Sequence, residues 1–387
     1  YIVLARSIIL ATGETNRLTR NASGNPYDSW HIPYNTGDGH AMALKVGAKL
    51  ANMEFTDATI TPKGYSSQGT NGFVGAGAYL INKDGERFMF NYHPAGEQAR
   101  RTDLINAVIS ETQAGRSPIY VDCRHLKKED VERLKITLGI DRPAMTAFLD
   151  QKEIDLEKDL LEITISEMSS RGGGVVFRRA GVRIDTECLS NIPGLFAAGD
   201  CSTVSQGISG AAVMGHIAGE RAAEYALSQP FPEPLTKKEL EDIQNNLTRP
   251  LKEDSEYTPR DFEDEVREIM TEDVGFRRNE TKLEKAIDKL SLLEDKEKSI
   301  KADNFHGLMR FHEAKNLRTV AHVVSVSALE RRETRGGGAH VRTDYPDRDD
   351  KNPPYTLVVE KEINSTKLKF DKIPTNLGVD VVEKKKN

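Results

Sequence analysis

The sequence predicts an α/β fold, and three stretches support that prediction. Residues 195–198 resemble a short buried strand that ends in Gly199-Asp200. Residues 1–13 resemble a fully buried strand that ends in Thr12-Gly13. Between about 56 and 190, short apolar runs, glycines and helical patterns alternate. Ligands of open α/β folds bind beyond the carboxyl ends of the strands, so both strand ends are candidate binding positions.

Length and composition limit the possible functions. A chain of 387 residues is long enough for two or three domains. Its net charge of −6 argues against a nucleic-acid partner. No run approaches the ~18 apolar residues of a membrane span, so we expect no direct span.

The three cysteines predict neither a disulfide framework nor a metal or iron–sulfur site. Cys123, Cys188 and Cys201 lie far apart, and the chain has no C-x-x-C motif. Lone thiols fit a reducing compartment, so we expect a cytoplasmic protein. A position at the membrane periphery through a partner protein is the other option.

A helix is predicted to follow Thr36-Gly37-Asp38, with Asp38 as its cap. A second helix begins at Gly207-Ile208 among small residues, which leave its first N–H groups accessible to an anionic or polarised group.

These motifs resemble those of the fumarate reductase / succinate dehydrogenase flavoproteins. The match is GLFAAGD at 194–200 before a small-residue helix, and TGDGxAMAxxxGA at 36–48. The resemblance implies FAD as the cofactor. It implies cofactor contacts at Thr12, Gly13, Asp38, Gly199, Asp200, Gly207 and Ile208.

Three further motifs occur in the same order as in that family. Residues 75–89 resemble GEGGxLxNxxGERFM, residues 101–126 resemble RDxVxxAxxxE…LDxRHL, and residues 333–350 resemble ESRGAHxRxDYPxRDD. The resemblance implies a partial Rossmann-like FAD-binding domain with an inserted α+β capping domain and a C-terminal helical domain. The expected ranges are 1–55 with 190–229, 56–189 and 235–335, followed by a tail over 336–387.

One family feature has no counterpart in the sequence. No G-x-G-x-x-G motif lies between a strand and a helix, although such a motif holds the pyrophosphate of a dinucleotide. We therefore expect the chain to be a fragment that lacks the N-terminal half of its flavin domain.

The resemblance also assigns catalytic and substrate residues. In the family, the Arg that opens the 101–126 motif exchanges a proton with the substrate carbon. That position is Arg101, with Arg100 as the neighbouring candidate and a further substrate-binding residue. Thr70 matches a substrate contact, and Thr61 stands where the family has a substrate-binding His.

Several substrate clamps of the family are missing. Val74 replaces one Arg, Val176 stands near the place of a His, and the segment at Gln206 lacks a His and an Arg. A dicarboxylate held bidentately needs such charged groups. We therefore expect hydride transfer between flavin N5 and a small anionic substrate other than succinate or fumarate.

Two alternatives stay open, and both are flavoproteins. The first resembles the α subunit of adenylylsulfate reductase, on the segments 63–76, 101–119 and 331–335. The second is a non-catalytic flavin-binding remnant. As an enzyme, the chain is expected to pass electrons to a separate iron–sulfur subunit.

Overall fold

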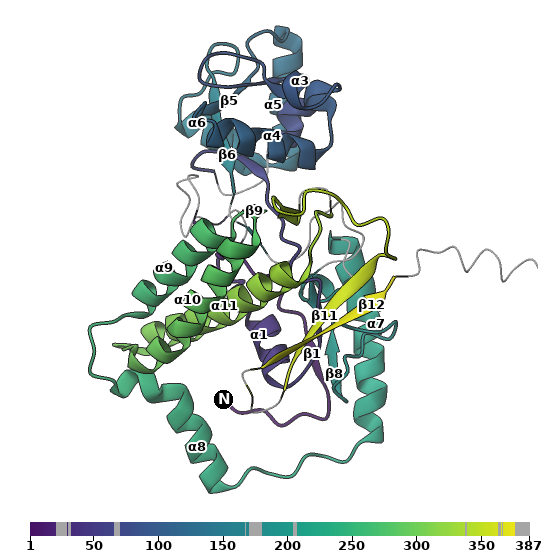
Figure 1. Ribbon diagram of the computed structural model, residues 1–387, viewed down its shortest axis with the longest axis vertical. Coiled ribbons are helices and arrows are strands. Elements are labelled where there is room, and N and C mark those ends of the chain that lie inside the picture. Colours follow the sequence, from purple (N-terminus) through teal and green to yellow (C-terminus); the bar gives the residue numbers. More distant parts are fainter. Residues whose placement is uncertain are drawn as a thin grey trace, which may run out of the picture. The chain divides into compact units, whose positions relative to one another are not determined.

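The computed structural model divides the chain into two compact units (Figure 1). Unit 1 comprises residues 1–18, 35–57 and 169–387, and unit 2 comprises residues 19–34 and 58–168. The structure describes residues 1–20, 29, 32–65, 70–166, 168–169, 180–203, 207–336, 339–362, 365 and 367–375.

The sheets of unit 1 are small. Their strands are β1 (Ile8–Leu10), β2 (Leu50–Ala51), β7 (Gly181–Val182), β8 (Leu195–Ala197), β9 (Arg277–Arg278), β10 (Val341–Arg342), β11 (Tyr355–Lys361) and β12 (Leu368–Pro374). β1 pairs in parallel with β8, β9 pairs in parallel with β10, and an antiparallel sheet has the order β12-β11-β2-β7. Because β7 pairs with β2, residues 181–182 lie in unit 1, although the sequence placed them in the inserted domain.

Most of the C-terminal half of unit 1 is helical. The helical elements are α1 (Asp38–Lys45), η3 (Gly199–Cys201), α7 (Gly207–Ser228), α8 (Lys237–Thr248), η4 (Arg249–Lys252), α9 (Pro259–Ile269), the π-helical turn η5 (Met270–Val274), α10 (Glu280–Lys296), η6 (Glu297–Ser299) and α11 (Phe305–Glu330). α9, α10 and α11 lie side by side (Figure 1). Thr258 begins α9 with a capping box and Pro259 at its first position, which satisfies N–H groups that the helix leaves free.

The first strand is shorter and more exposed than predicted. β1 covers only three residues, and the side chains of Ile8 and Ile9 are 54% and 40% exposed. The prediction of a fully buried strand over residues 1–13 was wrong. Within the described residues β1 pairs only with β8, and its outward face lies open beside Met42 and Val46.

The segment predicted as a tail contains a β-hairpin. β11 and β12 pair along seven residues, and β11 also pairs with β2. Leu357, Val358 and Val359 are all buried, since β11 has a neighbouring strand on each side. Residues 376–387 lie outside the described part of the chain.

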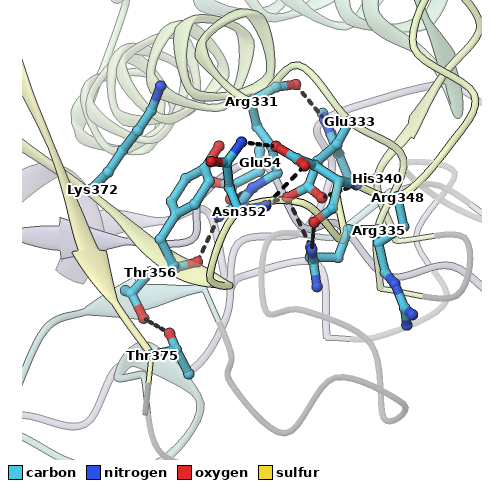
Figure 2. A network of polar contacts seen from close by, with 12 residues as sticks. Glu54, Arg331, Glu333, Arg335, His340, Arg348, Asn352, Thr356, Lys372 and Thr375 are labelled. Atoms are coloured by element: carbon cyan, nitrogen blue, oxygen red, sulfur yellow. Dashed lines mark hydrogen bonds and ion pairs between the residues drawn. The ribbon is translucent and has the colours of Figure 1, made fainter. Parts of the chain in front are cut away.

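A buried charge cluster anchors this C-terminal segment to the rest of unit 1 (Figure 2). Arg331, just after α11, is fully buried and contacts Glu54 through Nε at 2.6 Å and Glu333 through Nη1 at 2.8 Å. Its Nη2 donates to the carbonyl of Tyr355 at 3.2 Å. Burial raises the pKa of Glu54, and Arg331 opposes that shift. One guanidinium thus joins the segment after β2, the end of α11 and β11.

Unit 2 packs helices against an antiparallel sheet. The strands β3 (Ile60–Pro62), β6 (Leu161–Ile165), β5 (Ile119–Asp122) and β4 (Tyr79–Ile81) follow one another in the sheet in that order. The helical elements are α2 (Thr70–Gly75), α3 (Met89–Tyr92), η2 (Gly96–Gln98), α4 (Arg101–Gln113), α5 (Lys128–Asp141) and α6 (Pro143–Gln151). Leu104, Val121 and Leu134 belong to the buried core between sheet and helices.

The α/β fold class and the helical C-terminal region predicted from the sequence are confirmed by these elements. Within the described residues, no helix has the length and hydrophobicity needed to cross a bilayer.

Two neighbouring arginines test the role of the buried cluster. Arg331→Gln leaves Glu54 without its buried cation, so unfolding free energy should fall by about 3–5 kcal/mol. Arg332 is 61% exposed and pairs with Glu280 at the surface, so Arg332→Gln should cost below about 1 kcal/mol. Urea unfolding measures both values. Equal losses of unfolding free energy in the two variants would contradict the anchoring role of the buried cluster.

Candidate functional site

The two strand ends singled out in the sequence lie at one edge of a parallel pair. Leu10 is the register partner of Ala197, and the carbonyl of Leu10 accepts the N–H of Ala198 at 2.9 Å. The same carbonyl accepts the Sγ–H of Cys201 at 3.0 Å. Parallel strands present their carboxyl ends together. Thr12-Gly13 and Gly199-Asp200 therefore emerge at the same edge.

The start of α1 packs directly against the first of these ends. A Cβ on Gly39 would lie 1.9 Å from Oγ1 and 3.0 Å from Cβ of Thr12, so only glycine fits. The helix is preceded by Gly37 at φ 80°, and the side chain of Asp38 makes no capping hydrogen bond. The prediction that Asp38 caps the helix was wrong. Gly37 occupies the cap position, and Asp38 is the first helical residue.

His40 joins three segments at this edge. Its Nε2 lies 3.2 Å from the carbonyl of Cys201, and its Nδ1 lies 2.8 Å from Oγ1 of Thr15. The ring is 1% exposed, and burial lowers the pKa of His40 to about 4. A neutral ring satisfies both contacts when Nε2 carries the proton and Nδ1 accepts from Thr15. The helix that begins with Asp38 is thus tied to the turn that contains Asp200.

Asp38 is half-buried, and its carboxylate is held by a neighbouring residue and by one residue of α11. Its Oδ1 accepts from Nδ2 of Asn316 at 2.6 Å and from Oγ1 of Thr36 at 3.2 Å. Asn316 belongs to α11, so the helical part of unit 1 orients this carboxylate.

The second candidate helix begins in an open position. Gly199 has φ 71°, which glycine adopts easily, and Asp200 is half-buried in η3. α7 starts at Gly207, where an added Cβ would meet nothing within 4 Å, and Ile208 is 91% exposed. The start of α7, which packs against η3, and the half-buried carboxylate of Asp200 fit a group that carries both anionic and hydroxyl oxygens. FAD is such a group.

In unit 2, the predicted catalytic residue Arg101 and the predicted substrate-binding residues Thr61 and Thr70 contact or lie on one segment. Arg101 donates from Nη2 to the carbonyl of Ala58 at 2.8 Å, and Thr70 donates to the carbonyl of Ile60 at 2.8 Å. Thr61 follows Ile60 in β3 and donates to the carbonyl of Tyr65 at 2.9 Å. Both threonine side chains are buried. Arg101 and Thr70 therefore both bond to the backbone of the short segment that carries Thr61.

Arg100 is not part of that group. Its side chain is 78% exposed, and its Nε lies 3.7 Å from Oδ2 of Asp103. Val74 is buried in the core of unit 2. Val176 and Gln206 lie outside the described residues.

Sequence reasoning missed His40 and Asn316 as parts of this site. His40 lies within the motif at 36–48, and its position two residues after Asp38 could have indicated that it lies near the cofactor. Asn316 lies 278 residues beyond Asp38 and has no local pattern that marks it.

Comparison with protein families identifies two matching regions. Residues 2–215 match the family described as FAD binding domain, and residues 263–385 match the family described as fumarate reductase flavoprotein C-term.

Individual proteins match over most of the chain. An uncharacterized FAD-dependent oxidoreductase of Methanocaldococcus jannaschii is 31% identical over 369 residues, which cover 90% of this chain and 62% of the relative. One of the subunits of the fumarate reductase (CoM/CoB) of Methanothermobacter marburgensis is 31% identical over 354 residues, which cover 84% of this chain and 60% of the relative. This chain spans about three fifths of the length of these curated relatives.

Among solved structures, the adenylylsulfate reductase of Archaeoglobus fulgidus has a similar fold. The TM-score is 0.80 and the sequence identity 23%, with 96% of this chain and 67% of that chain covered.

The close approach of Gly39 to Thr12 can be tested with an added methyl group. Gly39→Ala should lower unfolding free energy by about 1–3 kcal/mol, because rotation of the Thr12 side chain cannot clear its Cβ. FAD affinity should fall as well. Gly139 lies inside α5, where the nearest atom is 3.8 Å away, so Gly139→Ala should be neutral or stabilise by about 0.5–1 kcal/mol. Urea unfolding and FAD titration measure both variants, and similar behaviour of the two would contradict this account.

Proposed function

The chain belongs to the FAD-binding domain family, and we propose that it works as an FAD-dependent oxidoreductase related to fumarate reductase and succinate dehydrogenase. Family membership confirms the expected FAD-binding domain and the resemblance seen in the sequence. The wider activity is inferred from relatives that are longer than this chain.

The observation that supports the proposal most strongly is the meeting of two distant segments at one strand edge. His40 contacts the backbone of Cys201 across 161 positions of sequence, and this contact brings the Asp38 and Asp200 segments together. Thr12, Gly13 and Gly199 lie at the same edge, and Gly207 with Ile208 begin the open helix α7. These residues would hold the cofactor.

Bound FAD supplies the hydride chemistry at its N5 atom. The contribution of this chain is to bind and orient the cofactor and to move a proton. Asp38 and Asp200 offer carboxylate oxygens that can accept hydrogen bonds from hydroxyl groups, and the first N–H groups of α7 can donate to a polarised oxygen. The protein thereby provides geometry and electrostatics.

Arg101 is the proposed proton carrier. Its guanidinium is half-buried and is oriented by the carbonyl of Ala58. A guanidinium is a weak acid, because it holds its proton far above neutral pH. It can deliver a proton only where water is excluded and where another group replaces that proton. Its position as the first residue of α4 leaves its side chain at the helix end.

The proposed substrate is a small anion other than succinate or fumarate. Thr61 stands where the family has a substrate-binding His, and its hydroxyl donates to the backbone. Val74, in the place of an arginine, is buried among apolar side chains. With fewer charged clamps, a dicarboxylate would bind less tightly. Arg100, Thr61 and Thr70 remain the proposed substrate-side residues.

A separate iron–sulfur subunit is the proposed electron partner. The fumarate reductase relative is named as a subunit, which supports assembly with other chains. At 23% identity, the similarity to adenylylsulfate reductase indicates a shared fold only. A flavoprotein subunit of that type is the second candidate. A non-catalytic flavin-binding remnant is the third, and the presence or absence of turnover by the parent chain separates it from an enzyme.

FAD binding is the first test of the proposal. The purified chain, mixed with FAD, should quench flavin fluorescence and retain flavin absorbance after gel filtration. Asp200→Ala should weaken binding by about ten-fold or more, because a hydrogen bond to a charged group is lost. Asp84, an exposed turn residue of unit 2, provides the matched control, and Asp84→Ala should bind as the parent does. Absence of flavin binding by the parent chain would refute the proposal.

Turnover of Arg101 variants tests the assignment of the proton carrier. With a reduced or oxidised artificial electron mediator and a panel of small anions, Arg101→Lys should lose about 100-fold or more in turnover while retaining FAD. Arg100→Lys distinguishes the two neighbouring candidates, and Arg133→Lys provides an exposed control on α5. Loss in Arg100→Lys alone would move the role to Arg100. Unchanged turnover in both would exclude either arginine as the proton carrier, whereas a parent chain that binds FAD and turns over none of the anions would support the non-catalytic alternative.

A further inference from the structure

A second buried charge cluster includes Arg17, which belongs to the loop between β1 and α1. Residues 14–19 of this loop are all buried. The loop runs beside the start of α1, since Asn16 donates its N–H to the carbonyl of Asn35 at 2.7 Å and Thr15 forms a β-bridge with Thr36. The loop directly follows Thr12-Gly13, so its conformation affects the positions of these proposed cofactor-binding residues.

Arg17 adopts an unfavourable backbone conformation in this loop. Its φ is 62°, in the left-handed region that a residue with a long side chain rarely occupies. Such a conformation persists only where the surrounding structure imposes it, and it occurs often at functional sites.

The surrounding structure imposes it through ion pairs. The side chain of Arg17 is fully buried, with Nε 3.0 Å from Oε1 of Glu263, Nη2 on the other oxygen of Glu263, and Nη1 3.2 Å from Oε2 of Glu313. The two-pronged contact with Glu263 fixes the plane of the guanidinium as well as its position.

A second arginine completes an alternating arrangement of charges. Arg310 contacts Glu263 and Glu313, and its side chain is 15% exposed. Glu263 belongs to α9, whereas Arg310 and Glu313 belong to α11. In these contacts each guanidinium lies between two carboxylates, so the charges of opposite sign stabilise one another.

We propose that Arg17 is a positioning residue of the FAD site, through which α9 and α11 hold the loop after β1 in the shape required for FAD binding. This inference rests on the proposed function. The strained backbone at Arg17 and the buried pairs to two helices are the observations that support it. Arg17 is not proposed to touch the cofactor, and its effect passes through residues 13–16.

FAD affinity of matched arginine variants tests this role. Arg17→Lys keeps the charge but loses the two-pronged contact, and it should raise the Kd for FAD by about ten-fold. Arg318 also lies on α11, is 9% exposed, and pairs with Glu297 of η6 at 2.8 Å and with Glu294 of α10 at 3.3 Å. Arg318→Lys should change the Kd for FAD by less than about two-fold, although it removes a contact of the same type.

Hydrogen exchange of the apo-protein provides a second readout. It tests the proposal even if Arg17→Lys does not fold. Glu313→Gln is a milder change that keeps the shape of the side chain. It should speed exchange of amides 13–18 while leaving the second half of α11 as protected as in the parent.

The outcomes separate this inference from the proposed function. A parent chain that binds no FAD contradicts both. If the parent binds FAD but the Arg17 and Arg318 variants lose affinity equally, or if exchange rises uniformly in Glu313→Gln, the cluster serves general stability only and the positioning role is wrong.

Discussion

The parallel pairing of β1 with β8 is the constraint on which the candidate site depends. The carbonyl of Leu10 accepts hydrogen bonds from Ala198 and from Cys201, so the two strand ends cannot separate without losing both. Segments near residues 12 and 200 are thereby brought to one edge. α1 then closes against that edge, because Gly39 allows direct contact with Thr12 and His40 reaches Cys201.

Buried charge is the second organising feature of unit 1. Arg17, Arg278, Arg331 and Arg342 are among the largest fully buried side chains. Removing a guanidinium from water costs free energy, and only close carboxylates or carbonyls offset that cost. Arg278 and Arg342 bond to backbone carbonyls as well as to side chains, and Arg342 donates to carbonyls at the end of α11. The contact from Arg278 to Glu54 joins segments 224 positions apart in the sequence.

Much of the fold could be predicted where the signal was local. The helix at α4 follows from the spacing of Leu104 and Val108, and the strand at β8 from its short apolar run before Gly199. The hairpin of β11 and β12 was not predicted, because β12 carries two lysines and an aspartate and is largely exposed, although Leu357-Val358-Val359 in β11 is a short apolar run. The cap of α1 was also wrong, since glycine at φ 80° stands at a position where a polar side chain was expected.

By itself, the sequence determined the family, the α/β class and the motif positions at Asp38, Arg101 and Asp200, because ordered motifs are properties of the chain. Only the tertiary structure decided which groups meet. The bonds from His40 to Cys201, from Asn316 to Asp38 and from Arg17 to Glu263 each span more than 150 positions. Contacts over such separations depend on how the segments pack, and no local pattern of residues encodes them.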